Sequence, residues 1–225
     1  MNPISEIHRL NNEIKSSGLV ELTWGNASIR VGELIYIKPS GVDTTKLSYP
    51  SDDASCIVNI NTGQTIGESK PSVDLGIHLE LYRGFPDINS IIHTHSKYAT
   101  IFAQASRSIT CLGTTHADYF NGDIPVVNLL TSWEDYEVDT GNSIVQHFKN
   151  NELDYHEINA CLIEKHGAFV WDSDPQSCLN SSIVLELVAE MAYNSLMLGG
   201  TERLPNHVLE KHYKRKHGDT KYYGQ

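Results

Sequence analysis

The sequence predicts an α/β fold: a single-domain α/β/α sandwich whose central sheet is mostly antiparallel, with some mixed pairing. Short runs rich in isoleucine and valine alternate with longer amphipathic stretches over the 225 residues. Tight turns separate several of the short runs, which indicates antiparallel hairpins, and no regular βαβ repeat is present. Because the sequence shows neither an internal repeat nor a linker rich in Gly, Pro and Ser, we expect one domain over residues 1–225.

An amphipathic helix is expected at the start of the chain. Ile4, Ile7, Leu10 and Ile14 recur at helical spacing, so this helix should end near Ser17. Strands are expected next, separated by turns that contain Gly, Pro or Asn. They cover residues 28–31, 34–38 and 54–60.

Helices and strands are mixed in the remainder of the chain. A helix is expected over residues 73–82, followed by a strand that begins at Ser90 and carries His93 and His95 near its end. Two further strands are expected over 124–127 and 160–164. The other expected helices cover 98–105, 141–148, 176–198 and 206–215.

The composition excludes several classes of protein. A formal net charge of −11 argues against general binding of nucleic acid, which needs a basic surface. No apolar run is long enough to span a bilayer, and residues 1–15 lack the apolar core of a signal peptide. The four cysteines form no C-x-x-C pair, as expected of reduced thiols. We therefore expect a cytoplasmic protein that does not bind membranes.

The segment His93-Thr94-His95 predicts half of a metal site. On a strand, positions i and i+2 point to one face, so both imidazoles can reach one ion. Such a pair also occurs on exposed strands without any metal. Asp74 at an expected helix start and His166 at an expected strand end are the candidate further ligands, although His166 alone is equally consistent with an ordinary loop residue. Three imidazoles and a carboxylate suit zinc, with manganese or cobalt as alternatives.

Three turns of small residues offer the groups that hold a phosphate: backbone N–H groups, hydroxyls and lysine charges. Each could equally be an ordinary turn, and none has the P-loop spacing. These turns are Gly25-Asn26-Ala27-Ser28, Lys38-Pro39-Ser40-Gly41 and Lys70-Pro71-Ser72.

Two further segments could take part in catalysis. The block from Gly113 to Phe120 concentrates hydroxyls, an imidazole and the carboxylate of Asp118, although Asp118 could also cap a short helix. The segment 211–217 is basic within an acidic chain, which is typical of a solvated helix face, and residues 222–225 have the character of a frayed end.

Taken together and in this order, these motifs resemble the class II aldolase/epimerase/adducin-head family over nearly the whole chain. The block Gly-Thr-Thr-His-Ala-Asp-Tyr-Phe and the ending Tyr-Tyr-Gly-Gln resemble the epimerase branch of that family. The motifs that carry the resemblance are Thr23-Trp24-Gly25-Asn26, Lys38-Pro39-Ser40-Gly41-Val42-Asp43, His93-Thr94-His95-Ser96, Gly113 to Phe120 and Tyr222-Tyr223-Gly224-Gln225.

The resemblance implies a role for each matching residue. It implies one Zn²⁺ per subunit, replaceable by Mn²⁺ or Co²⁺, and a homotetramer in which neighbouring subunits share the active site, with His212 close to it. The implied metal ligands are Asp74, His93, His95 and His166; the implied acid/base pair is Asp118 and Tyr223; the implied substrate-binding set is Gly25, Asn26, Lys38, Ser40, Gly41, Ser72 and Val73.

The implied reaction interconverts L-ribulose 5-phosphate and D-xylulose 5-phosphate by zinc-assisted retro-aldol cleavage, as in pentose phosphate metabolism and arabinose breakdown. Val73 departs from the family pattern, which has a second serine there, and the segment 125–139 is shorter than usual. A sugar-phosphate aldolase or lyase is the alternative, although aldolases carry glutamate at the position of Asp74. A non-catalytic binding module like the adducin head is a more distant alternative, against which the four ligand-type residues argue.

Overall fold

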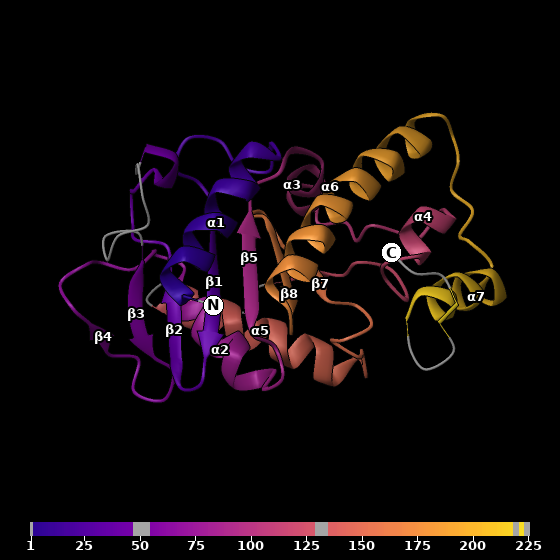
Figure 1. Ribbon diagram of the computed structural model, residues 1–225. Helices are drawn as coiled ribbons and strands as arrows, with labels where there is room; N and C mark the ends of the chain where they lie inside the picture. The colour runs from indigo at the N-terminus through magenta and orange to yellow at the C-terminus, as the bar shows by residue number, and fades with distance from the viewer. Residues whose placement is uncertain (1, 47–54, 129–134, 218–220, 223–225) are drawn as a thin grey trace.

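The computed structural model describes residues 2–46, 55–128, 135–217 and 221–222. Within them, eight strands form one sheet in the order β4-β3-β2-β1-β5-β8-β7-β6 (Figure 1). The strands are β1 (Asn26–Val31), β2 (Leu34–Ile37), β3 (Cys56–Asn59), β4 (Thr65–Ile66), β5 (Ser90–Thr94), β6 (Val126–Val127), β7 (Ala160–Ile163) and β8 (Ala168–Asp172).

The sheet is antiparallel except at one edge. Every neighbouring pair from β4 to β7 runs antiparallel, and only β6 and β7 pair in parallel. The predicted α/β class with a mostly antiparallel, mixed sheet is therefore confirmed. All residues of β5 and β7 are buried, as expected of central strands covered on both faces.

Helices cover both faces of the sheet (Figure 1). One apolar core packs residues of α1, α3 and α6 against the sheet, and a second packs α2 and α5 against the other face. The short α4 and α7 lie side by side at the end of the molecule opposite β4. The helices are α1 (Pro3–Ser16), the 3-10 turn η1 (Thr44–Lys46), α2 (Leu75–Gly84), α3 (Lys97–Gln104), α4 (Thr114–Ala117), α5 (Tyr136–Asn150), α6 (Pro175–Met197) and α7 (Asn206–Lys216).

Helix α1 shows how the local sequence specifies an element. The Asn2 side chain accepts a hydrogen bond from the backbone N–H of Ile4 and caps the helix start. Ile7, Leu10 and Ile14 are buried in the first core, so the predicted apolar face is the buried one. In the described part of the chain, no helix is both long and apolar enough to cross a membrane.

Several elements differ from the prediction, among them the short strand β4, which no sequence pattern indicated. The sequence pattern does not predict strand β8, because its residues form one short apolar run whose period is compatible with either a strand or a buried helix. Helix α5 begins at Tyr136 rather than at Gly141, because its first turn has little apolar periodicity and is held instead by packing against α2. The expected strand over 124–127 shortens to β6, while Ile124 forms an isolated bridge with Ile109.

The contact between α2 and α5 depends on a glycine. A Cβ atom added at Gly141 would lie 2.6 Å from the Cβ of Glu80 and 3.0 Å from the carbonyl oxygen of Ile77. These neighbours belong to α2, and one of them is backbone that cannot move aside. Gly141 therefore lets the two helices approach more closely than any other residue would allow.

We predict that Gly141→Ala lowers the free energy of unfolding by about 1–3 kcal/mol, because overpacking outweighs the better helix propensity of alanine. Urea unfolding monitored by circular dichroism measures this. Asn142→Ala is the matched control, since residue 142 is exposed on the same helix. A Gly141→Ala protein as stable as the control would show that the close contact is unimportant.

Candidate metal centre

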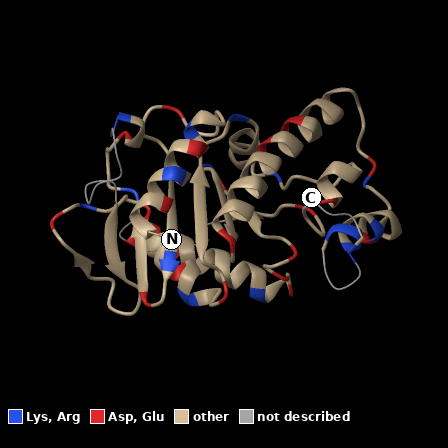
Figure 2. Cartoon of the chain, in the orientation of Figure 1, with Lys and Arg blue, Asp and Glu red and all other residues tan. Residues whose placement is uncertain are grey.

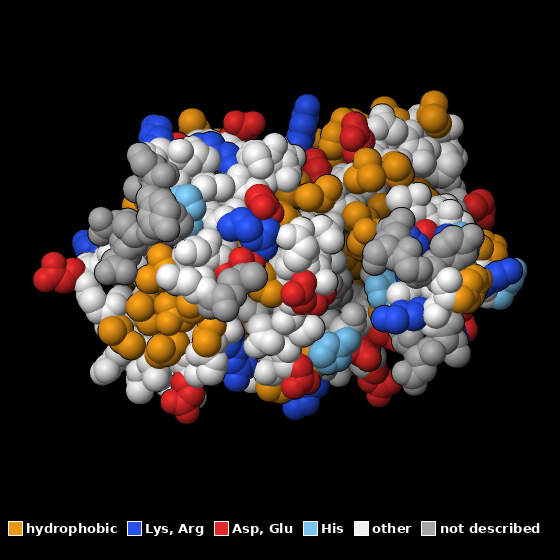
Figure 3. Space-filling view, viewed as in Figure 1, with side chains coloured by type: hydrophobic (Ala, Val, Ile, Leu, Met, Phe, Trp, Pro, Cys, Tyr) orange, Lys and Arg blue, Asp and Glu red, His pale blue; other side chains and the backbone are white. Residues whose placement is uncertain are grey.

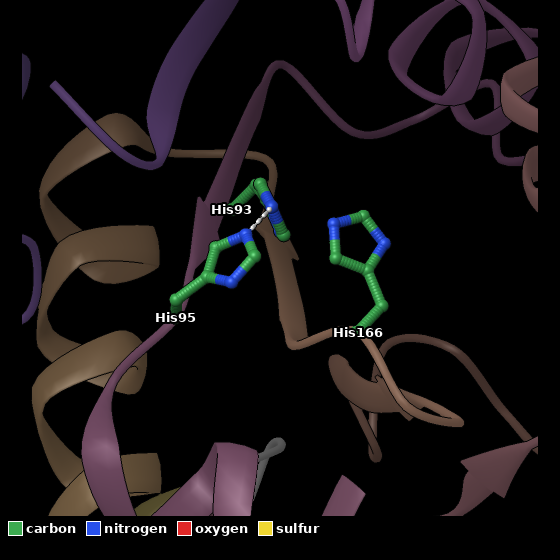
Figure 4. Close-up of side chains that lie close together, drawn as sticks. All are labelled: His93, His95 and His166. Atoms are coloured by element: carbon green, nitrogen blue, oxygen red, sulfur yellow. Dashed lines mark hydrogen bonds between the residues drawn. The ribbon is translucent and has the colours of Figure 1, made fainter. Parts of the chain in front are cut away.

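Three histidines from two chain segments converge at the end of the central strand. His93 lies in β5, His95 directly follows that strand, and His166 lies in the turn between β7 and β8. One nitrogen from each ring lies within 4.8 Å of the others, and the three imidazoles face one another (Figure 4). The Nε2 atoms of His93 and His95 are 3.1 Å apart. Two zinc ligands at roughly 2.0–2.1 Å in tetrahedral geometry are about 3.3 Å apart, so this spacing fits one shared ion.

The other nitrogen of His93 is already committed. Its Nδ1 lies 3.0 Å from the carbonyl oxygen of Ala168 on the neighbouring strand β8, and only a protonated Nδ1 can donate to that oxygen. The proton is therefore on Nδ1, and the lone pair of Nε2 faces the cluster. A ring held in this way is typical of metal-ligating histidines.

Burial keeps the three rings uncharged. Loss of solvation lowers the pKa of His93 to about 3, although the carboxylate of Asp74 opposes the shift. Burial also lowers the pKa values of His95 and His166 below the ordinary value, again against Asp74. Neutral imidazole is the form that binds metal, so the cluster is ready to accept a cation at neutral pH.

Asp74 supplies an anionic oxygen beside the histidines. It precedes α2, and its Oδ2 atom lies 4.0 Å from Nε2 of His93 and accepts a hydrogen bond of 2.7 Å from the side-chain amide of Asn26. Burial acts to raise the pKa of this carboxyl, but the pKa lies below its usual value, and the hydrogen bond from the Asn26 amide contributes to the lowering. Three neutral nitrogens and one carboxylate form a donor set suited to a divalent metal.

Gly25 allows the first strand to approach this cluster. Its backbone has φ +71°, and an added Cβ would lie 2.7 Å from the carbonyl oxygen of His93. A residue with a side chain would be strained and would clash there. Asn26 is consequently the register partner of His93 in the β1–β5 pair, which brings its amide to Asp74.

A cavity of about 620 Å³ opens beside the cluster. The residues that the sequence analysis expects to bind substrate and metal, apart from His93, meet in its wall. Its lining residues are Thr23, Trp24, Gly25, Asn26, Lys38, Ser40, Gly41, Ser72, Val73, Asp74, His95 and His166.

The two Lys-Pro-Ser turns of the sequence form one wall of this cavity together. Pro39 and Pro71 form an antiparallel bridge, the N–H of Ser40 donates to the carbonyl oxygen of Lys70, and the N–H of Ser72 donates to that of Lys38. The two Lys-Pro-Ser segments, which are similar in sequence, are therefore hydrogen-bonded to each other in the structure. Their hydroxyls and the buried ammonium of Lys38 lie within one cavity wall.

Two polar groups of the cavity favour an anionic or hydroxylated ligand. The Lys38 Nζ donates to the carbonyl oxygen of Thr23 at 3.0 Å, and burial lowers the pKa of this ammonium even though Asp74 opposes the shift. The Oδ1 atom of Asn26 is buried and has no hydrogen-bond partner among the described residues. A ligand hydroxyl could supply that missing hydrogen bond.

Asp118 lies apart from the histidine cluster within one chain. It follows α4, and its carboxylate accepts hydrogen bonds from Arg215 and from Nδ1 of His212 on α7, where basic side chains gather (Figure 2). It lines a different cavity, of about 490 Å³, which shares no lining residue with the first. Tyr223 lies outside the described residues.

Sequence reasoning missed two groups next to the cluster. The carbonyl oxygen of Ala168 holds His93, and the hydroxyl of Tyr136 lies 3.1 Å from Nδ1 of His166. No local signal could reveal them, because the first is backbone of an unpredicted strand and the second lies in a helical turn that the apolar pattern did not include.

Comparison with known proteins identifies the family. The model of the Class II Aldolase and Adducin N-terminal domain matches residues 5–193. The chain belongs to this family. The resemblance expected from the motifs is therefore confirmed.

Relatives of this class II aldolase family chain extend over nearly its full length. A protein of Mycoplasma pneumoniae (strain ATCC 29342 / M129 / Subtype 1), named "Probable L-ribulose-5-phosphate 4-epimerase UlaF", is 40% identical over 230 residues, which cover 98% of this chain and 93% of that protein. A solved L-fuculose 1-phosphate aldolase has a TM-score of 0.79 at 22% identity, with 95% of each chain covered. The sugar-phosphate aldolase of Thermotoga maritima has a TM-score of 0.67 at 20% identity, over 91% of this chain and 97% of that one. At such identities the two structures show the shared fold alone.

We predict that His95→Asn in this class II aldolase family member weakens zinc binding by more than about 100-fold, since it removes a direct ligand and outer-shell partners alone contribute about 10–100-fold. Metal content after gel filtration, measured by mass spectrometry, reports the loss. His156→Asn is the control, because the His156 side chain is 53% exposed and pairs with Asp87 away from the cluster. Stoichiometric zinc in the His95→Asn protein would disprove the site.

Proposed function

We propose that the chain is an L-ribulose-5-phosphate 4-epimerase that interconverts L-ribulose 5-phosphate and D-xylulose 5-phosphate. The observation that carries this proposal is the 40% identity, over 98% of the chain, to the Mycoplasma protein of that name. The enzyme would act in the cytoplasm on a small sugar phosphate, in pentose phosphate metabolism such as arabinose breakdown. We propose that it binds neither nucleic acid nor a membrane.

The geometry of the cavity supports a sugar-phosphate substrate. The histidine cluster lies at one part of its wall, and the paired turns with Ser40, Gly41 and Ser72 form another. Hydroxyls, backbone N–H groups and the Lys38 ammonium are the groups that bind phosphate. We assign phosphate binding to these turns, and binding of the substrate hydroxyls to Gly25 and Asn26, whose Oδ1 atom is buried without a partner in the described structure.

The metal of the proposal is Zn²⁺, one per subunit, with Mn²⁺ or Co²⁺ as substitutes. His93, His95, His166 and Asp74 would hold it, since their donor atoms converge and the rings are neutral. A divalent cation in this site supplies Lewis-acid stabilisation of the negative charge that develops when the C3–C4 bond of the substrate breaks. The residues that line the cavity would orient the substrate at the metal.

The acid/base chemistry needs two groups on opposite sides of C4. One removes the proton of the C4 hydroxyl as the C3–C4 bond breaks, and the other returns a proton to the new hydroxyl after the aldehyde has turned its other face and the bond has re-formed. Asp118 and Tyr223 take these roles in the proposal. Asp118 lines a cavity other than the one beside the histidines of its own chain. A neighbouring subunit must therefore bring Asp118 to the histidines, which favours a shared site between subunits.

An exposed apolar surface on α6 supports such an assembly. Ile183, Leu187 and Met191 recur at helical spacing along this helix and are 38%, 42% and 44% exposed. Figure 3 shows apolar side chains gathered over α6. Apolar surface of this kind is typical of protein interfaces and supports association of subunits. The homotetramer of the proposal follows from the family resemblance.

Val73 is the departure from the family pattern. It is 70% exposed and lines the cavity beside Ser72, so it offers an apolar surface where a serine would offer a hydroxyl. Loss of one hydrogen bond to a charged acceptor costs about 1.5–3 kcal/mol when nothing replaces it. Lys38, Ser40 and Ser72 remain as the phosphate donors of the proposal.

We predict that the zinc-loaded protein converts L-ribulose 5-phosphate into D-xylulose 5-phosphate without releasing glycolaldehyde phosphate, because an epimerase retains the cleaved fragment. A coupled assay that follows both products in the same sample measures this. Released aldehyde would identify an aldolase instead. The absence of turnover in protein with bound zinc would refute the proposed substrate.

We also predict that His95→Asn and Asp118→Asn complement each other. Each variant alone should be inactive, whereas co-expressed and co-purified subunits should recover about a quarter of the wild-type rate, because random mixing completes one shared site in four. The rate is measured on the mixed tetramer, with separately purified variants combined in the assay as the control. No recovery would mean that both residues act within one chain.

A further inference from the structure

Tyr136 lies next to the histidine cluster and belongs to neither the proposed metal ligands nor the acid/base pair. It is the first residue of α5, and its hydroxyl oxygen is 3.1 Å from Nδ1 of His166. We propose that Tyr136 is a positioning residue that holds the His166 ring in the orientation that binds the metal. This inference rests on the metal centre of the proposed function.

The hydrogen bond sets which nitrogen of His166 is available. Figure 4 shows one ring nitrogen of His166 facing the other two imidazoles. Because the Tyr136 hydroxyl lies at Nδ1, the facing nitrogen is Nε2. An Nε2 lone pair given to a metal leaves the ring proton on Nδ1, which then donates to the Tyr136 oxygen. The phenol oxygen can accept this proton, so the contact restrains the ring in the orientation that points Nε2 at the cluster.

The same arrangement occurs twice in the cluster with different partners. His93 donates from Nδ1 to the backbone carbonyl of Ala168, whereas the partner of His166 is a side chain. A backbone partner persists in any substitution, so only the second contact can be removed by changing one residue. Tyr136 is consequently a position through which the chain can adjust the metal affinity of a histidine ligand without changing that ligand.

The packing of α5 fixes the tyrosine in place. The hydroxyl of Thr140 donates to the carbonyl oxygen of Tyr136 at 2.6 Å within the first turn. An added Cβ on Gly76 of α2 would lie 2.9 Å from the Cβ of Glu137, so the first turn of α5 lies directly against α2. Asp74 immediately precedes α2. The ligand Asp74 and the partner of the ligand His166 are therefore positioned by one helix pair.

The test is Tyr136→Phe, which removes the hydroxyl and retains the ring. Zinc and cobalt affinities are measured by competition with a chromophoric chelator, and the melting temperature of the metal-free protein is measured alongside. We expect about 10–100-fold weaker binding of both ions, the usual effect of losing an outer-shell partner, with an unchanged metal-free melting temperature. An altered visible spectrum of the cobalt form is expected as well, because the His166 ring is less restrained.

Tyr155→Phe is the matched control, since its hydroxyl donates to Asp87 outside the cluster. It should bind both ions like the wild-type protein. A Tyr136→Phe affinity within about threefold of that control would overturn the inference. So would equal losses in both variants, because the effect would then not be specific to the His166 contact.

A measurement on the wild-type protein keeps the inference testable even if the variant fails to fold. In the zinc-loaded, nitrogen-15-labelled protein, the Nδ1 proton of His166 should be observed by NMR and be protected from exchange. An unprotonated Nδ1, or an Nδ1 proton that exchanges freely with solvent, would overturn the inference. Absence of zinc binding by the wild-type protein would refute the metal centre itself, whereas tight zinc binding without epimerisation would refute only the proposed reaction.

Discussion

The candidate site depends on the register between the central strands β5 and β8. In this register His93 lies opposite Phe169 and Thr94 opposite Ala168, so the Ala168 carbonyl accepts the Nδ1 proton of His93 and the Phe169 ring stacks on its imidazole at 4.2 Å. The turn that leads into β8 carries His166 to the same place. A shift of one residue would turn His93 to the opposite face of the sheet and separate the three rings.

Close backbone approach extends this arrangement to the cavity. Gly25 lets β1 approach the carbonyl of His93, and the pairing of Pro39 with Pro71 joins two turns that are distant in sequence. Both contacts bring polar groups to the histidines without a long side chain having to reach across. These backbone contacts fix the turns that line the cavity before a ligand binds, which lowers the entropic cost of binding.

Electrostatics separate the two groups of candidate catalytic residues. Burial keeps the histidine rings neutral and leaves the carboxylate of Asp74 as the nearby anion, which suits a cation. Asp118 instead accepts hydrogen bonds from Arg215 and His212 on the basic α7. The chain as a whole carries a net charge of −11, yet basic side chains of α7 surround Asp118, the carboxylate to which we assign proton transfer.

The sequence by itself determined the α/β class, most helices and strands and the family, because these depend on local periodicity and on motifs such as His93-Thr94-His95 that are short and contiguous. It did not reveal β8, the start of α5, or Tyr136 as the partner of His166. Only the tertiary structure decided that the two Lys-Pro-Ser turns pair and that Asp118 lies apart from the histidines. These features are contacts between residues far apart in the chain, and packing and register, rather than local propensity, fix them.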